Sequence, residues 1–237
     1  MKQEEQQELI KSQIAVIKKL DLVQREGFIE IERVFQRVNK KGVEKLVIDS
    51  KYYPKGDLVT YVGNIAFLPY PKRVQMIAEI AKSLAFMHEN GVIHRDIHPG
   101  NILVDEREQC RLTDFDVSSF EGKHFDVMRG ATYHLAPELF HAEVSPALDI
   151  WALGITAFQL FLTSDKYPYS QLPDKITNEI IQKEAPFVQE RLKEYVCSDY
   201  SGLIHPMLEV DPKKRVSAKE VARQADELLK TLLSTET

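Results

Sequence analysis

Two short polar motifs constrain this chain more than any other part of its sequence. The first, His94-Arg95-Asp96-Ile97-His98-Pro99-Gly100-Asn101, is followed thirteen residues later by Asp114-Phe115-Asp116. Each motif lies beside a short apolar run, so an acid, an amide and a second acid are expected on two neighbouring loops. Phosphoryl transfer from Mg-ATP needs this set, with one group to orient a hydroxyl and two oxygen donors to hold the metal.

A third motif, Ala136-Pro137-Glu138, follows the first two in the chain. In this order and at this spacing, H-R-D-x-x-x-x-N, D-F-x and A-P-E resemble the protein kinase family. The resemblance covers nearly the whole chain and implies an α+β, protein-kinase-like fold of two lobes. It predicts a partial N-lobe at 1–50 with a helix and a short β-sheet, a hinge at 51–57 and a mostly helical C-lobe at 58–237.

Composition and charge are those of an ordinary globular protein. The 237 residues are 43% hydrophobic and 28% charged, which is enough for a core in one or two modest domains. A net charge of −5 without a basic block argues against nucleic acid as a partner, and no apolar run could span a membrane. Two distant cysteines, Cys110 and Cys197, favour a reducing compartment, so we expect a cytoplasmic protein or one delivered to another cell's cytosol.

The periodicity of apolar residues predicts the order of helices and strands. Helical spacing predicts a first helix at 3–20, and two apolar or alternating runs predict a hairpin of strands at 28–38 and 43–49. Asp57 is a suitable N-cap for a short helix. Further helices are expected at 73–90, 146–162, about 175–183, 199–209 and 217–233, with short strands at 102–104 and 111–113 and a loop at 117–137.

The resemblance assigns chemical roles to three polar residues of the first two motifs. Asp96 matches the aspartate that orients the proton of the substrate hydroxyl, which a carboxylate of ordinary pKa can do. Asn101 and Asp114 match the family's metal ligands, and their oxygen atoms suit Mg²⁺. Either motif alone would also fit an ordinary surface loop, but their occurrence together favours phosphoryl transfer.

The segment at 51–57 resembles the hinge that binds the adenine and ribose of ATP in this family. An ordinary solvated loop is the alternative interpretation of this segment. The resemblance implies Ser50 as the gatekeeper, backbone groups of Lys51, Tyr52 and Tyr53 at the adenine, Asp57 at the ribose and Leu103 beneath the base.

Other residues match positions that support the fold in protein kinases. Asp149, at the start of an apolar helix, resembles a buried aspartate that accepts hydrogen bonds from the catalytic loop. Glu138 and Arg215 match a structural ion pair of the family. His94 and Phe115 occupy the structural positions of the two motifs to which they belong.

The chain departs from the family pattern upstream of the hinge. No G-x-G sequence, which would form a lid over the phosphates, occurs in the chain, and no Val-Ala-x-Lys precedes the first helix. Gln13 falls where the family has the glutamate that pairs with that lysine. A neutral amide suits the missing lysine because an unpaired carboxylate facing the core is costly. Alternatively, Gln13 is only a tolerated helix residue.

Three further changes fall around the catalytic motifs. His98 replaces the lysine of Ser/Thr kinases and, when protonated, could donate to a γ-phosphate oxygen; otherwise it is a solvent-facing loop residue. Ala131 stands where a loop threonine is expected, and Thr132 follows it. Asp116 replaces the glycine of Asp-Phe-Gly, which removes a permissive backbone position and adds a charge that could contact the metal or disfavour flipping of the loop.

Arg95 matches an arginine that binds a phosphate on the activation loop of protein kinases. Residues 120–130 contain no Ser, Thr or Tyr, so Asp126 or Glu121 could take the place of the phosphate and keep the loop ordered. A solvated acidic loop is the alternative. Unchanged activity and loop protection in Asp126→Ala would contradict the regulatory hypothesis.

Three functions fit these residues. The first is a Ser/Thr-type protein kinase with ATP and Mg²⁺ as cofactors and a protein as substrate, in which an upstream segment or an activating or scaffolding partner could complete the phosphate site. The second is a pseudokinase that acts as a docking module, because losing the lysine should cost several kcal/mol of barrier, roughly a hundredfold or more in rate. The third, a small-molecule kinase, is weaker because the Ala136-Pro137-Glu138 segment argues for protein substrates.

Overall fold

The protein has an α+β fold in which helices and short antiparallel sheets follow one another along the chain, as the sequence predicts. In this computed structural model, none of the helices among the described residues is long and apolar enough to cross a membrane. The structure describes residues 3–23, 25–40, 42–122, 134–139, 143–162, 183, 185, 186, 188, 190 and 198–235.

The described elements run from an N-terminal helix to a C-terminal helix, and the strands pair as β1 with β2, β3 with β6 and β4 with β5. All three pairings are antiparallel. The bounds of the elements are α1 Gln3–Leu20, β1 Ile31–Val38, β2 Glu44–Ser50, α2 Leu58–Gly63, α3 Tyr70–Glu89, β3 Val92–Ile93, η1 Pro99–Asn101, β4 Ile102–Val104, β5 Cys110–Leu112, β6 Ser119–Phe120, α4 Pro146–Leu162, α6 Ser198–Ile204, η3 His205–Leu208 and α7 Ala218–Thr235.

Most predicted boundaries agree with the structure. α1, β4 and α4 begin and end at the predicted residues, and β2, β5, α3 and α7 differ by a few residues at their ends. The helix predicted at 199–209 changes at His205 into the 3₁₀ turn η3, since Pro206 has no N–H to continue the helical hydrogen bonds. The strand β6 interrupts the loop predicted at 117–137. Only Lys183 of the helix predicted at 175–183 lies among the described residues.

The strand predicted at 28–38 is too long at its beginning, because β1 starts at Ile31. Phe28 is 1% exposed and forms a parallel bridge with Leu112 of β5 instead of pairing with β2. Its ring contacts the rings of Phe86 and Phe115, with centroids 6.0 and 6.1 Å away. Packing of this ring in the core therefore outweighs the local tendency of residues 28–30 to extend the hairpin.

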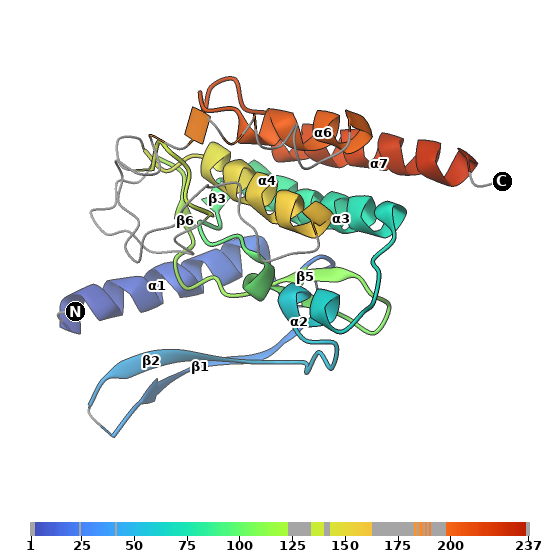
Figure 1. Cartoon of the computed structure of the whole chain (residues 1–237). Helices are drawn as coiled ribbons and strands as arrows, with labels where there is room; N and C mark the ends of the chain where they lie inside the picture. The colour runs from blue at the N-terminus through green and yellow to red at the C-terminus, as the bar shows by residue number, and fades with distance from the viewer. Residues whose placement is uncertain are drawn as a thin grey trace.

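The stacked helices α3, α4 and α7 form the side of the molecule away from the β1–β2 hairpin (Figure 1). α4 is buried along almost its whole length, and Trp151 within it is fully buried, because the helix is apolar on every face. Gly154 allows η3 to approach α4 closely, since a Cβ atom there would lie 2.7 Å from the Leu208 side chain.

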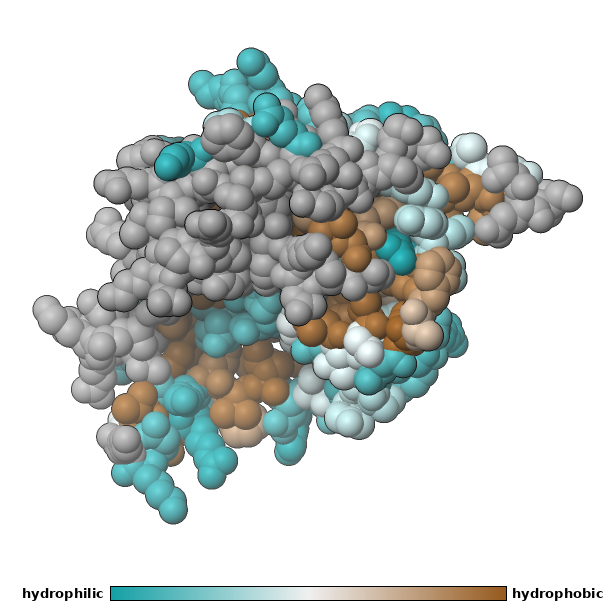
Figure 2. Space-filling view, viewed as in Figure 1, coloured by the Kyte–Doolittle hydropathy of each residue, from teal (hydrophilic) through white to brown (hydrophobic). Residues whose placement is uncertain are grey.

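The β1–β2 hairpin lies beside α1 on the opposite side of the molecule (Figure 1). Leu46 and Ile48 of β2 pack against the core, whereas Val34, Phe35 and Val38 of β1 are 38%, 40% and 58% exposed. Figure 2 shows apolar surface between long polar side chains in the region of this hairpin. The hairpin therefore gains less stabilisation from burial than the helical side does.

A buried arginine closes the C-terminal end of α4. Arg73 of α3 is 3% exposed, and its Nη1 donates to the carbonyl oxygens of Leu160 and Phe161 at 3.0 and 2.8 Å. Its Nε donates to the Leu68 carbonyl at 2.7 Å, and its guanidinium carbon lies 4.8 Å from the centroid of the Tyr70 ring. Carbonyls at a helix end need such partners because no helical N–H reaches them.

We expect Arg73→Met to lower the free energy of unfolding by about 2–4 kcal/mol, because three buried carbonyls lose their donor. Urea titration of both proteins measures this difference. The control is Arg223→Met on α7, where the arginine is 54% exposed and pairs with Glu220, so little change is expected. Equal effects of the two substitutions would contradict the capping role of Arg73.

Candidate active site

The two predicted site loops are brought together by strand pairing. The loop with Asp96 runs from β3 to β4, and the loop with Asp114 runs from β5 to β6. Since β3 pairs with β6 and β4 pairs with β5, the two loops are held close at both of their ends. The Thr113 N–H also donates to the Asn101 carbonyl oxygen at 3.1 Å, directly before Asp114.

Asp96 is held by the amide of Asn101. The Asn101 Nδ2 donates to the Asp96 Oδ2 at 2.9 Å and to the Asp96 carbonyl oxygen at 3.0 Å. His98 accepts the Gly100 N–H through Nδ1 at 3.1 Å, so a neutral His98 carries its proton on Nε2. That Nε2 lies 3.7 Å from the Asp96 Oδ2. The predicted amide and histidine therefore lie beside the carboxylate of the predicted acid, Asp96.

Asp149 of α4 holds the start of the loop that carries Asp96 through hydrogen bonds to its backbone. The carboxylate of Asp149 is fully buried and accepts the N–H of His94 at 2.8 Å, the N–H of Arg95 at 2.7 Å and His88 Nε2 at 2.8 Å. Burial raises the pKa of the Asp149 carboxyl, but the hydrogen bond with His88, the neighbouring His88 and His94 rings and the Arg95 N–H lower it below its ordinary value. Asp149 is therefore a buried anion that determines the direction of the loop.

His94 connects the two loops from within the core. Its Nε2 lies 3.0 Å from the Thr113 carbonyl oxygen, so Nε2 carries the proton and donates it, while Nδ1 faces the Asp96 N–H at 3.4 Å. Burial lowers the pKa of His94 below its ordinary value, which favours the neutral ring. The Phe115 ring packs 5.4 Å from the His94 ring, and both side chains are almost fully buried.

Two side-chain oxygens, one on each loop, are available to a metal. The Asp114 side chain is exposed, and its Oδ1 accepts the N–H of Asp116 at 3.2 Å. Asn101 uses its side-chain nitrogen for Asp96, so its side-chain oxygen Oδ1 is available as a second donor. Among the described residues, no three His, Cys, Asp or Glu side chains gather as a metal site. Two protein oxygens fit Mg²⁺, which keeps waters and takes phosphate oxygens from its nucleotide.

Asp116 lies near the N-terminal helix. Its backbone carbonyl oxygen accepts a hydrogen bond from Gln13 Nε2 of α1 at 3.1 Å, and Gln13 is 5% exposed. The helix α1 also contacts β6, which follows this loop. Gln13 therefore faces the core, but its hydrogen bond goes to a backbone group.

Glu138 and Arg215 form a buried, bidentate ion pair. The Arg215 Nη2 lies 3.0 Å from Glu138 Oε2, and Nη1 contacts Oε1. Arg215 also donates to the Glu209 and Ala147 carbonyl oxygens at 2.8 and 2.7 Å, and its guanidinium lies over the Trp151 ring. This ion pair joins the Ala136-Pro137-Glu138 segment to α4 and to the loop before α7.

Arg95 has a positive φ of 71° and donates from Nη1 to the Val117 carbonyl oxygen at 3.0 Å. It therefore contacts the segment that begins the predicted activation loop. Glu121, one proposed partner, is exposed in the structure. Asp126, Ala131 and Thr132 lie outside the described residues, so the hypothesis of an acidic substitute for a phosphate stays a prediction.

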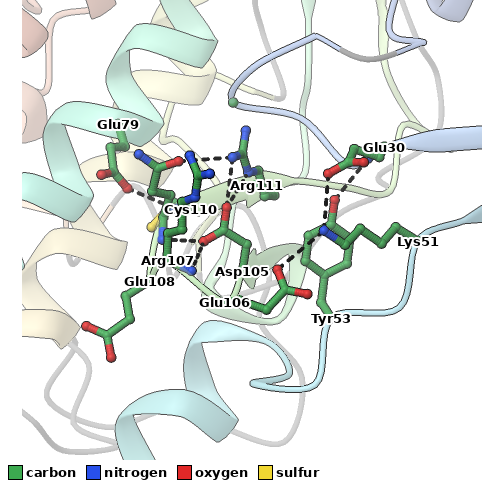
Figure 3. Close-up of polar contacts among 12 residues, drawn as sticks. Glu30, Lys51, Tyr53, Glu79, Asp105, Glu106, Arg107, Glu108, Cys110 and Arg111 are labelled. Atoms are coloured by element: carbon green, nitrogen blue, oxygen red, sulfur yellow. Dashed lines mark hydrogen bonds and ion pairs between the residues drawn. The ribbon is translucent and has the colours of Figure 1, made fainter.

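The segment predicted as a hinge contacts both the hairpin side and the β4–β5 turn (Figure 3). Lys51 Nζ lies 3.5 Å from Glu30 Oε1 and 3.4 Å from Glu106 Oε2. The Tyr53 hydroxyl accepts the Glu30 N–H at 2.9 Å, and burial raises the pKa of this phenol. Tyr52, by contrast, is 81% exposed. The side chain of Tyr53 therefore points inward, so only its backbone groups suit a ligand.

The residues predicted at the ribose and beneath the base are neighbours. Asp57 forms an isolated antiparallel bridge with Leu103 of β4. Asp57 is also the N-cap of α2, as predicted, because its Oδ1 accepts the Thr60 N–H at 2.7 Å. Ser50 ends β2, and its hydroxyl donates to the Lys51 carbonyl oxygen at 3.4 Å.

His134 belongs to the site but was not among the residues predicted from the sequence. It lines a small pocket beside Asp96, together with Leu135, Ala136 and Leu148. Its Nε2 lies 3.0 Å from Gln159 Oε1 of α4, and its ring centroid is 5.9 Å from that of His98. No motif in the sequence marks this histidine, and only its position just before Ala136 could have indicated it.

Because His134 is buried, we expect the stability of the protein to fall as the pH decreases below about 6.5. Burial lowers the pKa of His134 from 6.5 to about 4, so the folded state binds this proton less readily than the unfolded chain. The stability associated with the neutral His134 ring is fully present above the pKa of this histidine in the unfolded chain. It is lost as the pH falls toward the pKa of His134 in the folded state. Replacing His134 by Gln should reduce the fall in the free energy of unfolding between pH 7 and pH 4 by up to about 3 kcal/mol.

Urea titrations across this pH range measure the effect. The control is His205→Gln, at a partly exposed position in η3, which should leave the pH dependence close to that of the unsubstituted protein. An unchanged pH dependence in His134→Gln would show that His134 does not carry this effect.

Comparison with known proteins agrees with this geometry. Residues 1–225 match the protein kinase domain family. The chain is 28% identical over 214 residues to serine/threonine-protein kinase ppk34 of Schizosaccharomyces pombe, which covers 87% of this chain and 59% of that protein. It is 31% identical over 153 residues to calcium-dependent protein kinase 19 of Arabidopsis thaliana, which covers 62% of this chain and 27% of that protein.

A third relative is serine/threonine-protein kinase ppk25 of Schizosaccharomyces pombe, 27% identical over 73% of this chain and 41% of that protein. The chain thus spans between about a quarter and three fifths of the length of these three relatives. Since the family match covers nearly the whole chain and the motifs form one site, this chain belongs to the protein kinase family.

Proposed function

We propose that this chain is a Ser/Thr-type protein kinase that transfers the γ-phosphoryl group of Mg-ATP to a serine or threonine hydroxyl of a protein. The observation that carries this proposal is the carboxylate of Asp96, held by Asn101 in a loop whose backbone bonds to buried Asp149. A carboxylate fixed in this way can accept a hydrogen bond from a hydroxyl and direct its oxygen. The names of the relatives, which are serine/threonine kinases, support the choice of substrate class.

Nucleotide binding is assigned to the residues between the two loops and the hinge segment. Asn101 and Asp114 would hold Mg²⁺ through their free oxygens, and the metal would neutralise charge on the phosphates when bound. The neighbouring Asp57 and Leu103 would bind the ribose and the base, and the backbone of residues 50–53 would bind the adenine edge. The Asp57 Oδ1 accepts the Thr60 N–H, which leaves Oδ2 for a ribose hydroxyl.

Positioning is the main contribution that this chain makes to the reaction. The transition state of phosphoryl transfer is loose, so a correctly held hydroxyl matters more than a strong base. The Asn101 amide fixes the Asp96 carboxylate, and His98 keeps a nitrogen donor beside it. In this proposal His98 Nε2 donates to a phosphate oxygen, in place of the catalytic-loop lysine that the family resemblance implies at this position.

A protein substrate fits the surface next to Asp96. Three of the side chains that line the pocket there, Ile97, Leu135 and Ala136, are apolar. The last two lie just before Glu138, which forms the buried ion pair with Arg215. An extended segment of a partner protein could lie against these apolar side chains and place its hydroxyl at Asp96. We further propose that the protein acts in a cytosol and that an activating or scaffolding protein completes the phosphate site.

A docking function without phosphoryl transfer is the second candidate. Gln13 donates to a backbone carbonyl where the family resemblance implies a glutamate that pairs with a lysine. A lysine at the phosphates stabilises charge in the transition state, so a kinase that worked without one would be slower by several kcal/mol of barrier, of the order of a hundredfold in rate. This observation favours a pseudokinase, and the next experiment separates the two candidates.

We expect the chain to transfer label from ATP to itself or to a generic protein substrate when Mg²⁺ is present. Asp96→Asn should lower the initial rate by about a hundredfold or more, because the amide does not accept the hydroxyl proton. It should keep the thermal stabilisation by Mg-ATP, whereas Asp114→Asn should lose that stabilisation along with its activity.

Asp226→Asn on α7, where the carboxylate pairs with Lys82, is the matched control and should keep both activity and nucleotide binding. Labelling that persists in Asp96→Asn would contradict the role of this residue. No labelling above the level of the two site variants, together with no thermal shift on adding Mg-ATP, would favour the docking module.

A further inference from the structure

The hydrogen bond between Gln13 and Asp116 joins residues that lie 103 positions apart in the chain. Gln13 is on the face of α1 that packs into the core, with 5% of its surface exposed. Figure 1 shows α1 next to the segment that carries β6, and the two elements are in contact. The bond therefore connects the N-terminal helix to the loop that presents Asp114.

Two hydrogen bonds fix the backbone on both sides of Asp116. Its N–H, in the peptide group shared with Phe115, donates to the Asp114 Oδ1 at 3.2 Å. Its carbonyl, in the peptide group shared with Val117, accepts from Gln13 Nε2 at 3.1 Å. Asp114 itself has a φ of 62°, a conformation that costs energy for a residue with a side chain. The carboxylate of Asp114 is thus oriented by a peptide group that lies next to the one held by Gln13.

We propose that Gln13 is a positioning residue, and that its neutral amide donor holds the Asp114-Phe115-Asp116 loop in the conformation that presents Asp114 to Mg-ATP. This inference rests on the proposed function for the role of Asp114. The hydrogen bond supplies a connection between α1 and the metal loop that uses no lysine–glutamate pair. It also gives a chemical reason for glutamine at this position, which the sequence alone left open.

A glutamate at position 13 could not form the same contact. The partner is a carbonyl oxygen, which accepts hydrogen bonds, and an ionised carboxylate has no hydrogen to donate. Two oxygens with lone pairs would then face each other in a mostly buried site. A third negative charge would also lie close to Asp114 and Asp116. In this chain the residue typical of the family should therefore weaken the loop.

The test compares Gln13→Glu with Gln7→Glu, which makes the same change at an exposed position of the same helix. Hydrogen–deuterium exchange of peptides covering residues 114–118 reports on the loop without any activity measurement. We expect exchange in these peptides to become about five- to tenfold faster in Gln13→Glu, the factor that corresponds to one lost hydrogen bond. Gln7→Glu should exchange like the unsubstituted protein.

The second readout is the Mg²⁺ concentration that gives half of the thermal stabilisation by ATP. Gln13→Glu should raise this concentration several-fold, and Gln7→Glu should not change it. Gln13→Met keeps a flexible apolar side chain without the donor or a charge, so it should also speed exchange in the loop. Gln13→Met decides the result if Gln13→Glu fails to fold, which exchange throughout α1 would reveal.

Equal exchange at residues 114–118 in Gln13→Glu, Gln13→Met and the unsubstituted protein would overturn the proposal. Faster exchange in the loop with no change in the Mg²⁺ dependence would overturn its connection to the metal. If the unsubstituted protein shows no stabilisation by Mg-ATP at all, the proposed function fails, and the exchange measurement still decides whether Gln13 holds the loop.

Discussion

The rest of the site depends on the hydrogen bonds that the buried carboxylate of Asp149 accepts. An unpaired charge with no exposure would be very costly, so the folded state is stable only when donors surround it. Those donors are His88 of α3 and the backbone N–H groups of His94 and Arg95. The bond to Arg95 also compensates for its positive φ, so the same carboxylate that requires partners fixes the turn that leads to Asp96.

Strand pairing and ring packing extend this constraint to the second loop. β3 pairs with β6 and β4 pairs with β5, so the loops with Asp96 and Asp114 cannot separate without breaking backbone hydrogen bonds. His94 faces Thr113 and Phe115 from within the core, which joins the two loops a second time. The geometry of the candidate site thus depends on buried, neutral or fully bonded groups, while the Asp114 side chain remains exposed.

The N-terminal part of the chain contributes to the site through fewer contacts. Gln13 reaches the Asp114 loop through one hydrogen bond, and Phe28 packs between the rings of Phe86 and Phe115. The β1–β2 hairpin carries exposed Val34, Phe35 and Val38, in contrast to the almost fully buried α4. The hairpin therefore gains less from burial than α4 does, while Gln13 and Phe28 connect the N-terminal part of the chain to the Asp114 loop.

The sequence by itself determined the family, the α+β class and most element boundaries, since these follow from short motifs and from local apolar periodicity. α4 and β4 could be predicted to the residue because their apolar runs end abruptly. The tertiary structure decided which backbone groups meet: the Gln13 bond to Asp116, the place of His134 beside Asp96 and the pairing of Phe28 with β5. These contacts join residues distant in the chain, and their energies depend on burial and direction, which no local pattern contains.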